Sequence, residues 1–258
     1  PKFMAFSEQK RRIVGIIPAR YASTRFPGKP LAIINGFSMI ERVYRQVLSC
    51  RSVDEVVVAT DDQRIFDHVT YFGGKVVMTA ETHPSGTDRL GEALQLLADE
   101  GLNFDIAVNI QGDEPYIQPG QIEKVISLFN NPETEIATLI KKIEAPDELF
   151  NPNVVKVLTG ISGQALMFSR HPIPYFRGLP ENEWIHNHVY SKHIGIYAYT
   201  TKMLQQLIRL SPAPPEIAES LEQLRWLWNG YRIYTETTDF ETVGIDTPED
   251  LLKLTNIS

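Results

Sequence analysis

The sequence contains a single cysteine, Cys50, among its 258 residues. A disulfide within the chain is therefore excluded, and this composition is compatible with a reducing compartment. No apolar run approaches the roughly 20 residues that a membrane-spanning helix needs. The polar and basic residues 1–12 lack the apolar segment of a signal peptide. We therefore expect a soluble, cytoplasmic protein that makes no use of a membrane.

A surplus of positive charge is also missing. The chain has 25 Lys and Arg against 32 Asp and Glu, which gives a net charge of −7. Proteins that bind nucleic acid polymers usually carry a basic surface that neutralises many phosphates. The composition therefore argues against a nucleic acid polymer as partner, whereas a small anionic ligand needs only a local group of cations.

Two common nucleotide-binding motifs, the Walker A loop and the Gly-x-Gly-x-x-Gly fingerprint, are absent. In their place, the apolar run 13–17 leads into a loop of small residues with three cations, Arg20, Arg25 and Lys29. Such a run is typical of a buried parallel strand, and ligands bind at the carboxyl ends of parallel strands. Arg and Lys on such a loop suit a polyphosphate. Simple solvation of the three charges is the alternative.

Strand and helix patterns alternate through the first half of the chain. The strand patterns lie at residues 13–17, 55–60, 75–79 and 106–110. The helix patterns lie at residues 39–48, 63–71 and 89–99. This alternation predicts right-handed βαβ units and an α/β fold with a doubly wound, mostly parallel, Rossmann-like sheet.

The pattern changes in the second half of the chain. A hairpin pattern at 154–169 is followed later by a proline-rich linker at 211–215 and a helix pattern at 216–228. We therefore predict one domain over residues 1–258, with a core at about 13–145 and 233–258. An antiparallel and helical subdomain is expected as an insert at about 150–232.

Two aspartates follow short apolar runs in distant parts of the sequence. Asp113 stands in Gln111-Gly-Asp-Glu-Pro115 after the run 106–110, and Asp246 follows the run 243–245. If both runs are parallel strands of one sheet, the two carboxylates converge at one edge and offer the hard oxygen ligands that Mg²⁺ prefers. A turn at Asp113 and helix capping near Asp246 are the structural alternatives.

Several short stretches of this sequence, taken in order, resemble those of the 3-deoxy-manno-octulosonate cytidylyltransferase family. The resemblance covers about residues 13–252 and is weakest between 175 and 190. The matching strings are Ile13 to Pro30, Ser85-Gly-Thr-Asp-Arg89, Gln111-Gly-Asp-Glu-Pro115, Ser169-Arg170, Lys192-His-Ile-Gly-Ile-Tyr197 and Leu221-Glu-Gln-Leu-Arg225.

The resemblance implies a Mg²⁺-dependent enzyme that transfers CMP from CTP to the anomeric 2-hydroxyl of 3-deoxy-D-manno-octulosonate (Kdo) and releases pyrophosphate. The product would serve lipopolysaccharide biosynthesis. The resemblance also implies a homodimer that forms through the inserted region.

The same resemblance assigns roles to individual residues. The catalytic residues implied are Arg20, Lys29, Asp113 and Asp246, with the two aspartates as metal ligands. The nucleotide-binding residues implied are Ala19, Arg20, Ser23, Thr24, Lys29, Ser85, Gly86, Thr87 and Arg89. The sugar-binding residues implied are Gln111, Arg170, His193, Tyr197, Glu222 and Gln223.

Other interpretations of the same residues stay open. Thr87 is also a typical helix-capping residue, His193 suits a core position, and Glu222 suits a solvated helix face. A cytidylyltransferase for another keto-sugar acid, such as a neuraminate, would share the nucleotide site. A nucleotide-binding module without turnover is a second rival. A glycosyltransferase is disfavoured because no Asp-x-Asp motif follows the run 106–110.

Overall fold

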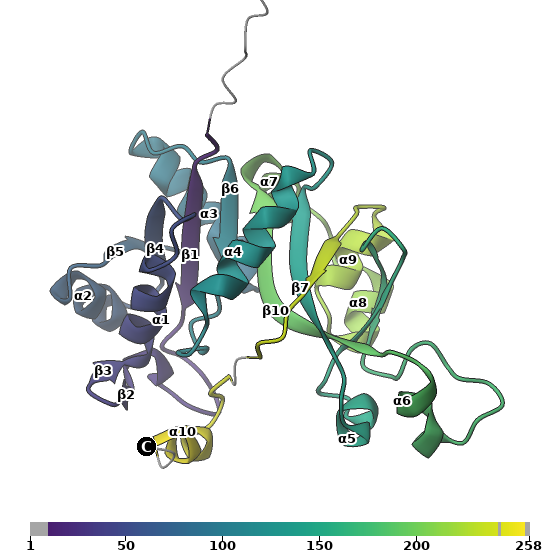
Figure 1. Ribbon diagram of the computed structural model, residues 1–258. Helices are drawn as coiled ribbons and strands as arrows, with labels where there is room; N and C mark the ends of the chain where they lie inside the picture. Colours follow the sequence, from purple (N-terminus) through teal and green to yellow (C-terminus); the bar gives the residue numbers. More distant parts are fainter. Residues whose placement is uncertain (1–9, 242–243, 256–258) are drawn as a thin grey trace, which may run out of the picture.

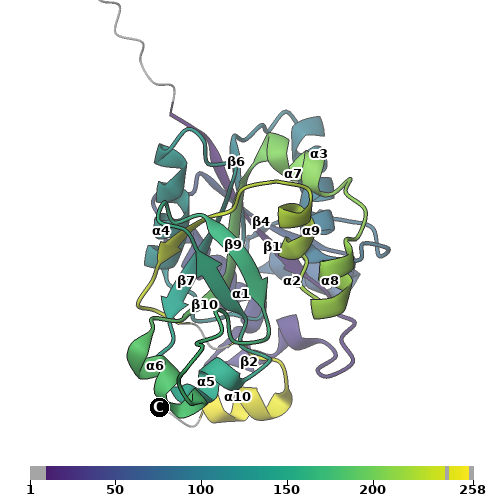
Figure 2. The same cartoon turned by 90° about the vertical axis from the view of Figure 1, so that its right-hand side faces the viewer.

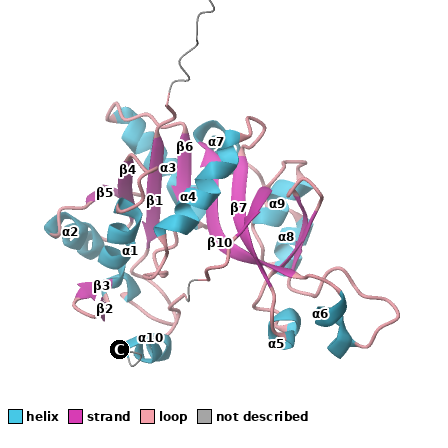
Figure 3. Ribbon diagram, viewed as in Figure 1, coloured by secondary structure: helices cyan, strands magenta, loops and turns pink. Residues whose placement is uncertain are grey.

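The computed structural model describes residues 10–241 and 244–255. A nine-stranded sheet with helices on both faces forms its centre (Figures 1 and 3). Seven of the strands follow one another across the sheet in the order β11-β7-β10-β6-β1-β4-β5. Their bounds are β1 (Ile13–Ala19), β4 (Glu55–Thr60), β5 (Lys75–Met78), β6 (Ile106–Asn109), β7 (Ile136–Lys142), β10 (Ser191–Thr200) and β11 (Tyr234–Thr237).

Most of these strands pair in parallel. β1 pairs in parallel with both β4 and β6, β4 with β5, and β11 with β7. β10 is antiparallel to its neighbours β6 and β7. Because Ile16 is opposite both Val57 and Asn109, the carboxyl ends of β1, β4 and β6 lie at the same edge of the sheet. The predicted α/β fold with a doubly wound, mostly parallel sheet is confirmed.

Side chains alternate across the sheet into two hydrophobic cores, as the period of a strand requires. In β1, Ile13 and Ile17 point into one core, and Val14 and Ile16 point into the other. The helices over the first core are α1 (Met39–Leu48), α2 (Gln63–Tyr71) and α4 (Pro119–Ser127). The helices over the second core are α3 (Gly86–Asp99), α7 (Thr201–Leu207) and α9 (Gln223–Trp228). Both faces of the sheet are therefore covered.

The helices start where the sequence provides caps. Ser38 ends its strand in extended conformation, and its hydroxyl accepts a hydrogen bond from the backbone N–H of Glu41 in α1. Thr200 does the same for α7 through the N–H of Met203. Such caps contribute about 1 kcal/mol each. They fix the points at which the chain leaves the sheet.

Shorter elements complete the fold. Near the carboxyl end of β1 lie the 3-10 helix η1 (Lys29–Leu31), β2 (Ile33–Ile34), β3 (Phe37–Ser38) and α10 (Pro248–Thr255). The other elements are η2 (Leu128–Asn130), α5 (Pro146–Phe150), β8 (Lys156–Thr159), β9 (Ala165–Ser169), η3 (Glu181–Glu183), α6 (Trp184–Asn187) and α8 (Pro214–Glu219). Figure 2 views the molecule from the side of β9, α8 and α9. Within the described ranges, no helix is long and apolar enough to cross a bilayer.

The predicted insert is not separate from the core along its whole length. Its hairpin is present as β8 and β9, and β8 also pairs with β10. β10, however, lies between β6 and β7 in the middle of the main sheet. Ile194 and Ile196 of β10 face one hydrophobic core, and Tyr197 and Tyr199 face the other. Burial on both faces is what a central strand requires, so residues 191–200 belong to the core sheet.

The single helix predicted at 216–228 is wrong. Two helices, α8 and α9, stand there, and the chain breaks between them at Ser220, whose φ of 52° is left-handed. α8 also begins inside the predicted linker, because Pro214 occupies a first-turn position where no backbone N–H is needed. In a similar way, α3 begins at Gly86 and not at residue 89.

Candidate active site

A cleft of about 440 Å³ opens at the carboxyl end of β1. The loop that follows β1 forms one wall, and residues 111–113 after β6 form another. The predicted site residues that line it are Ala19, Arg20, Ser23, Thr24, Lys29, Gln111 and Asp113. Two loops about 90 residues apart in sequence therefore meet at the edge where parallel sheets bind ligands.

Lys29 lies between the two predicted metal ligands. Its Nζ atom is 2.8 Å from Oδ2 of Asp113 and 3.4 Å from Oδ1 of Asp246. The backbone N–H of Ile245 donates to the carbonyl oxygen of Asp113 at 2.9 Å, which holds the two aspartate segments together. The two aspartates therefore converge as predicted, but residues 244–246 form no strand, so the hydrogen bond of Ile245 and not a parallel strand brings Asp246 to this edge.

Two glycines make this arrangement possible. A Cβ atom at Gly112 would lie 2.9 Å from the carbonyl oxygen of Pro18, too close for any side chain. Gly28, directly before Lys29, has a φ of 71° and packs against the ring of Tyr21. A side chain at Gly112 would push the Asp113 loop away from the end of β1, and a side chain at Gly28 would strain the cation loop and crowd the ring of Tyr21 within it.

The other two cations of the loop also make contacts. Arg25, which the resemblance does not place in the site, has its Nη1 atom 3.3 Å from Oδ2 of Asp246. The guanidinium of Arg20 donates to the carbonyl oxygen of His83, so it connects the β1 loop to the loop before α3. Membership of one basic loop was the only sequence signal for Arg25.

The Ser85-Gly-Thr87 string forms the start of α3. The Ser85 hydroxyl caps the helix by accepting the N–H of Asp88 at 3.2 Å. A Cβ atom at Gly86 would lie 3.4 Å from Cγ of Pro18, so the start of α3 packs beside the end of β1. Oγ of Ser85 and Oγ1 of Thr87 lie 3.1 Å and 2.8 Å from the carboxyl oxygens of Glu222. Two residues predicted to bind the nucleotide, Ser85 and Thr87, thus contact Glu222, which is predicted to bind the sugar.

Arg89 is fixed inside the fold. Its side chain is fully buried, with Nη2 2.6 Å from Oδ2 of Asp61 and Nη1 donating to the hydroxyl of Thr79. Arg89 does not line the cleft. Asp61 was missed by the sequence analysis, although it directly follows β4 at the same sheet edge. A contact between Arg89 and a nucleotide stays a prediction.

The predicted sugar-binding residues lie on β10, α9 and the chain after β9. Burial lowers the pKa of His193 to about 4, and its Nε2 lies 2.9 Å from the hydroxyl of Thr138. The rings of His193 and Tyr197 are 5.1 Å apart, and Gln223, the first residue of α9, is buried. Nε2 of Gln111 reaches the carbonyl oxygen of Gly195 at 3.5 Å, which joins the cleft to β10.

Arg170 braces the turn between α8 and α9. Its guanidinium donates to the carbonyl oxygens of Glu219, Ser220 and Pro152. Its backbone N–H donates to the carboxylate of Glu219 at 2.6 Å. Arg170 therefore fixes the segment that leads into Glu222, and its contact with a sugar acid stays a prediction.

The donor set at the sheet edge fits Mg²⁺. Within residues 10–241 and 244–255, no three or more His, Cys, Asp or Glu side chains are grouped as a metal site. Mg²⁺, however, binds proteins through one or two carboxylates and completes its shell with water and substrate phosphates. Asp113 and Asp246 offer two carboxylates that meet at Lys29 beside the cleft.

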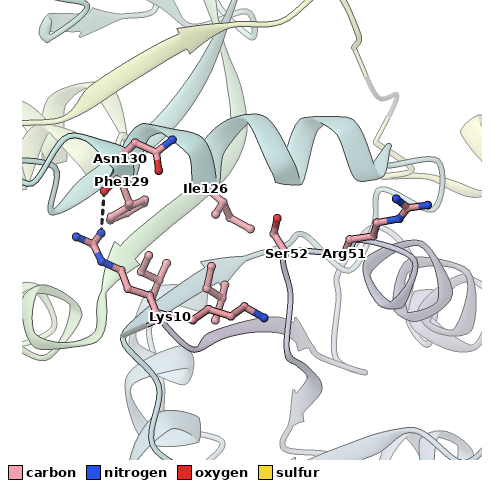
Figure 4. A pocket seen from close by; sticks show the side chains of 9 residues that line it. Lys10, Arg51, Ser52, Ile126, Phe129 and Asn130 are labelled. Carbon is pink, nitrogen blue, oxygen red and sulfur yellow. Dashed lines mark hydrogen bonds between the residues drawn. The ribbon is translucent and has the colours of Figure 1, made fainter. Parts of the chain in front are cut away.

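A larger hollow of about 630 Å³ lies at the opposite end of β1 (Figure 4). Its lining includes Lys10, Arg51, Ser52 and Phe129 but none of the predicted site residues. Lys10 is already paired with Asp54 at 3.0 Å, and Ser52 donates to Glu123. Because parallel sheets bind ligands at the carboxyl ends of their strands, the smaller cleft is the better candidate.

Comparison with known proteins identifies the family of this chain. Residues 14–233 match the cytidylyltransferase family. A 3-deoxy-manno-octulosonate cytidylyltransferase of Cytophaga hutchinsonii is 57% identical over 247 residues, which are 95% of this chain and 97% of that protein. The enzyme of the same description from Parabacteroides distasonis is 52% identical, over 94% of this chain and 96% of that protein.

Solved structures extend the comparison. The structure of CMP:2-keto-3-deoxy-manno-octonic acid synthetase complexed with CTP is 43% identical, with a TM-score of 0.87 over 95% of this chain and 98% of that one. A 4-diphosphocytidyl-2C-methyl-D-erythritol synthase from Anaerococcus prevotii, 13% identical, shares the fold with a TM-score of 0.62 over 96% of this chain and 98% of that one. The chain therefore belongs to the 3-deoxy-manno-octulosonate cytidylyltransferase family.

Proposed function

We propose that this protein transfers CMP from CTP to the anomeric 2-hydroxyl of Kdo and releases pyrophosphate. The observation that carries the proposal is the position of Lys29 between Asp113 and Asp246 at the edge of a cation-lined cleft. The names of the relatives, and the CTP bound in the related synthetase, support the same reaction.

Arg20 and Lys29 bind the triphosphate in this mechanism. When the sugar hydroxyl attacks the α-phosphorus, negative charge grows on the departing pyrophosphate. Fixed cations near that group stabilise the transition state more than the ground state, which is the condition for catalysis. Lys29 is held in place by two carboxylates, so little reorganisation is needed when the substrate binds.

Asp113 and Asp246 would hold Mg²⁺ in the same proposal. When bound, the ion would neutralise phosphate oxygens and favour the leaving pyrophosphate. The chain's own contribution is the rigid spacing of the two carboxylates, set by the hydrogen bond between Ile245 and Asp113 and by the close approach at Gly112.

The sugar acid would bind on the side of β10 and α9. Gln111, His193, Tyr197 and Gln223 offer polar groups for its hydroxyls, and Arg170 offers a cation for its carboxylate. Because the pKa of His193 is about 4, its ring is neutral near pH 7 and can donate one hydrogen bond and accept another. Polar groups of this kind reject analogues that lack a matching hydroxyl.

The protein would act as a homodimer in the cytoplasm and supply lipopolysaccharide biosynthesis. Tyr175 and Val189 are 69% and 64% exposed beside the small cluster around buried Trp184, in the predicted inserted region. Exposed apolar side chains gathered in this way suit an interface between two copies. Light scattering after size-exclusion chromatography would measure the mass, and Tyr175→Ser is expected to shift it toward the monomer.

The test of the reaction uses purified protein with CTP, Mg²⁺ and an equal mixture of Kdo and N-acetylneuraminate. We expect pyrophosphate and CMP-Kdo in equal amounts, as measured by phosphorus NMR and mass spectrometry. CMP-neuraminate as the main product would select the rival substrate. Binding of CTP without release of pyrophosphate would select the nucleotide-binding module. Sugar transfer from a preformed nucleotide sugar, tested in a separate reaction, would select a glycosyltransferase.

A further inference from the structure

The hydroxyl of Ser85 lies within hydrogen-bond distance of two carboxyl groups, those of Asp88 and Glu222, but has only one proton to donate. Oγ of Ser85 lies 2.6 Å from Oδ2 of Asp88 and 3.1 Å from Oε1 of Glu222. The same oxygen accepts the backbone N–H of Asp88 at 3.2 Å. A serine hydroxyl has one proton, so it cannot donate fully to two carboxylates. The shorter distance places that proton toward Asp88.

The second carboxyl oxygen of Glu222 has a donor of its own. Thr87 donates to Oε2 of Glu222 at 2.8 Å. If Glu222 were ionised, its Oε1 would face a Ser85 oxygen whose proton points elsewhere. If Glu222 carries a proton on Oε1, a continuous chain forms in which Thr87 donates to Glu222, Glu222 to Ser85 and Ser85 to Asp88. Every hydrogen in this chain then has one acceptor.

The surroundings place the extra proton on Glu222 and not on Asp88. Asp88 is in the first turn of α3, where the helix dipole favours a negative charge. Glu222 lies near Tyr197 and Tyr199 of β10, and those two rings pack against Trp226. The charged groups that face Glu222 are Asp88, which disfavours its ionised form, and Arg225, which favours it. Burial, the largest influence, raises the pKa of Glu222.

We propose that Glu222 is protonated and acts as a positioning residue, one that holds the Ser85-Gly-Thr87 turn in the conformation that receives the nucleoside triphosphate. This inference rests on the proposed function, because it assigns that turn to the nucleotide. It gives Glu222 a role before any sugar acid binds. It also ties the nucleotide turn to α9, which carries the predicted sugar residue Gln223.

The first experiment measures CTP affinity by calorimetry with Mg²⁺ and without sugar acid. Glu222→Gln keeps both contacts, because its amide oxygen accepts from Thr87 and its NH₂ donates to Ser85. We expect its Kd for CTP to stay within about twofold of the wild type, and Glu222→Ala to raise Kd by about tenfold. Glu100→Ala, an exposed change at the other end of α3, is the matched control and is expected to leave Kd unchanged.

The second experiment follows the same affinity against pH. In the wild type, affinity for CTP is expected to fall as pH rises through the raised pKa of Glu222, and in Glu222→Gln this fall is absent. Comparing the two proteins removes the titration of CTP itself. Thr87→Val removes one donor of the chain. It is expected to weaken CTP binding even if Glu222→Ala does not fold.

Three outcomes would overturn the inference. An unchanged Kd in a folded Glu222→Ala would leave Glu222 with no role in nucleotide binding. A Glu222→Gln as weak as Glu222→Ala would mean that the carboxyl group is ionised. Parallel pH profiles of CTP affinity in the wild type and Glu222→Gln would also mean that the carboxyl group is ionised. The affinity measurements contain no sugar acid, so their result does not depend on the proposed reaction. A protein that binds CTP as expected in them but fails to make CMP-Kdo in the reaction assay would contradict only the proposed function.

Discussion

The ammonium of Lys29 lies 2.8 Å from Oδ2 of Asp113, although 84 residues separate the two in sequence. Only 16% of the Lys29 side chain and 32% of the Asp113 side chain are exposed, so the pair is partly shielded from water. The contact brings the cation loop after β1 and the acidic loop after β6 to one point. That point is where the proposed reaction would take place.

Replacing Lys29 by alanine is expected to lower kcat by about 100- to 1,000-fold, the cost of losing one preorganised group that stabilises transition-state charge. Affinity for cytidine, which has no phosphates, should stay the same. Steady-state pyrophosphate release and cytidine titration measure the two quantities. Lys202→Ala, an exposed lysine on α7, is the control. Unchanged turnover in Lys29→Ala would remove the polyphosphate role.

Arg170→Ala is expected to raise KM for Kdo and to lower the free energy of unfolding by about 1–3 kcal/mol, because three carbonyl oxygens lose their donor. Substrate saturation curves and urea unfolding would measure both effects. Arg170→Lys should recover part of the stability, since one ammonium cannot reach all three oxygens. An effect confined to KM for CTP would contradict the assignment.

Breaking the pair of Asp61 and Arg89 should destabilise the fold strongly. Asp61→Ala leaves a fully buried guanidinium without its carboxylate, which typically costs about 3–5 kcal/mol of unfolding free energy. The double variant Asp61→Ala with Arg89→Met removes both charges and is expected to be more stable than Asp61→Ala alone. Urea unfolding checks the order. Equal stability of Asp61→Ala and the wild type would show that the pair contributes nothing.

Stability should also fall in mild acid because of His193. Burial lowers its pKa from 6.5 to about 4, so the unfolded chain binds a proton here at a higher pH than the folded protein does. The contribution of this histidine to stability is therefore complete above pH 6.5 and is lost as pH falls from 6.5 toward 4. The free energy of unfolding against pH should be flatter in this window in His193→Gln. Identical slopes in both proteins would contradict the shift.

Periodicity was sufficient to predict the parallel half of the sheet, because strands buried on both faces and helices with one apolar face leave clear patterns. The position of β10 was not predictable in this way. Pairing with β6 and β7 depends on contacts between residues 49 or more positions apart, which local patterns do not record. The break at Ser220 was missed because serine rarely takes a left-handed conformation.

The sequence likewise predicted only part of the candidate site. The rule that loops meet at the carboxyl edge of a parallel sheet was enough to bring Lys29 and Asp113 together. Asp246 joins them from residues 244–246, which form no strand and are held by the hydrogen bond from Ile245 to Asp113. The rule did not show that Arg89 turns inward to Asp61, since that depends on side-chain direction within α3. The contact of Ser85 with Glu222 was also not predictable, because the two residues are 137 positions apart and a left-handed turn lies between them.

The proposed site is tested most directly by measuring pyrophosphate release from CTP and Kdo against Mg²⁺ concentration in the wild type, Asp113→Asn, Asp246→Asn and the double variant. Each single change keeps the size of the side chain but removes a charged oxygen ligand. We expect each to lose activity severely and to need more Mg²⁺, with circular dichroism unchanged. The double variant should be little worse than either single one, because the two residues act as a unit. A normal Mg²⁺ profile in either single variant would remove that aspartate from the metal site and contradict the account.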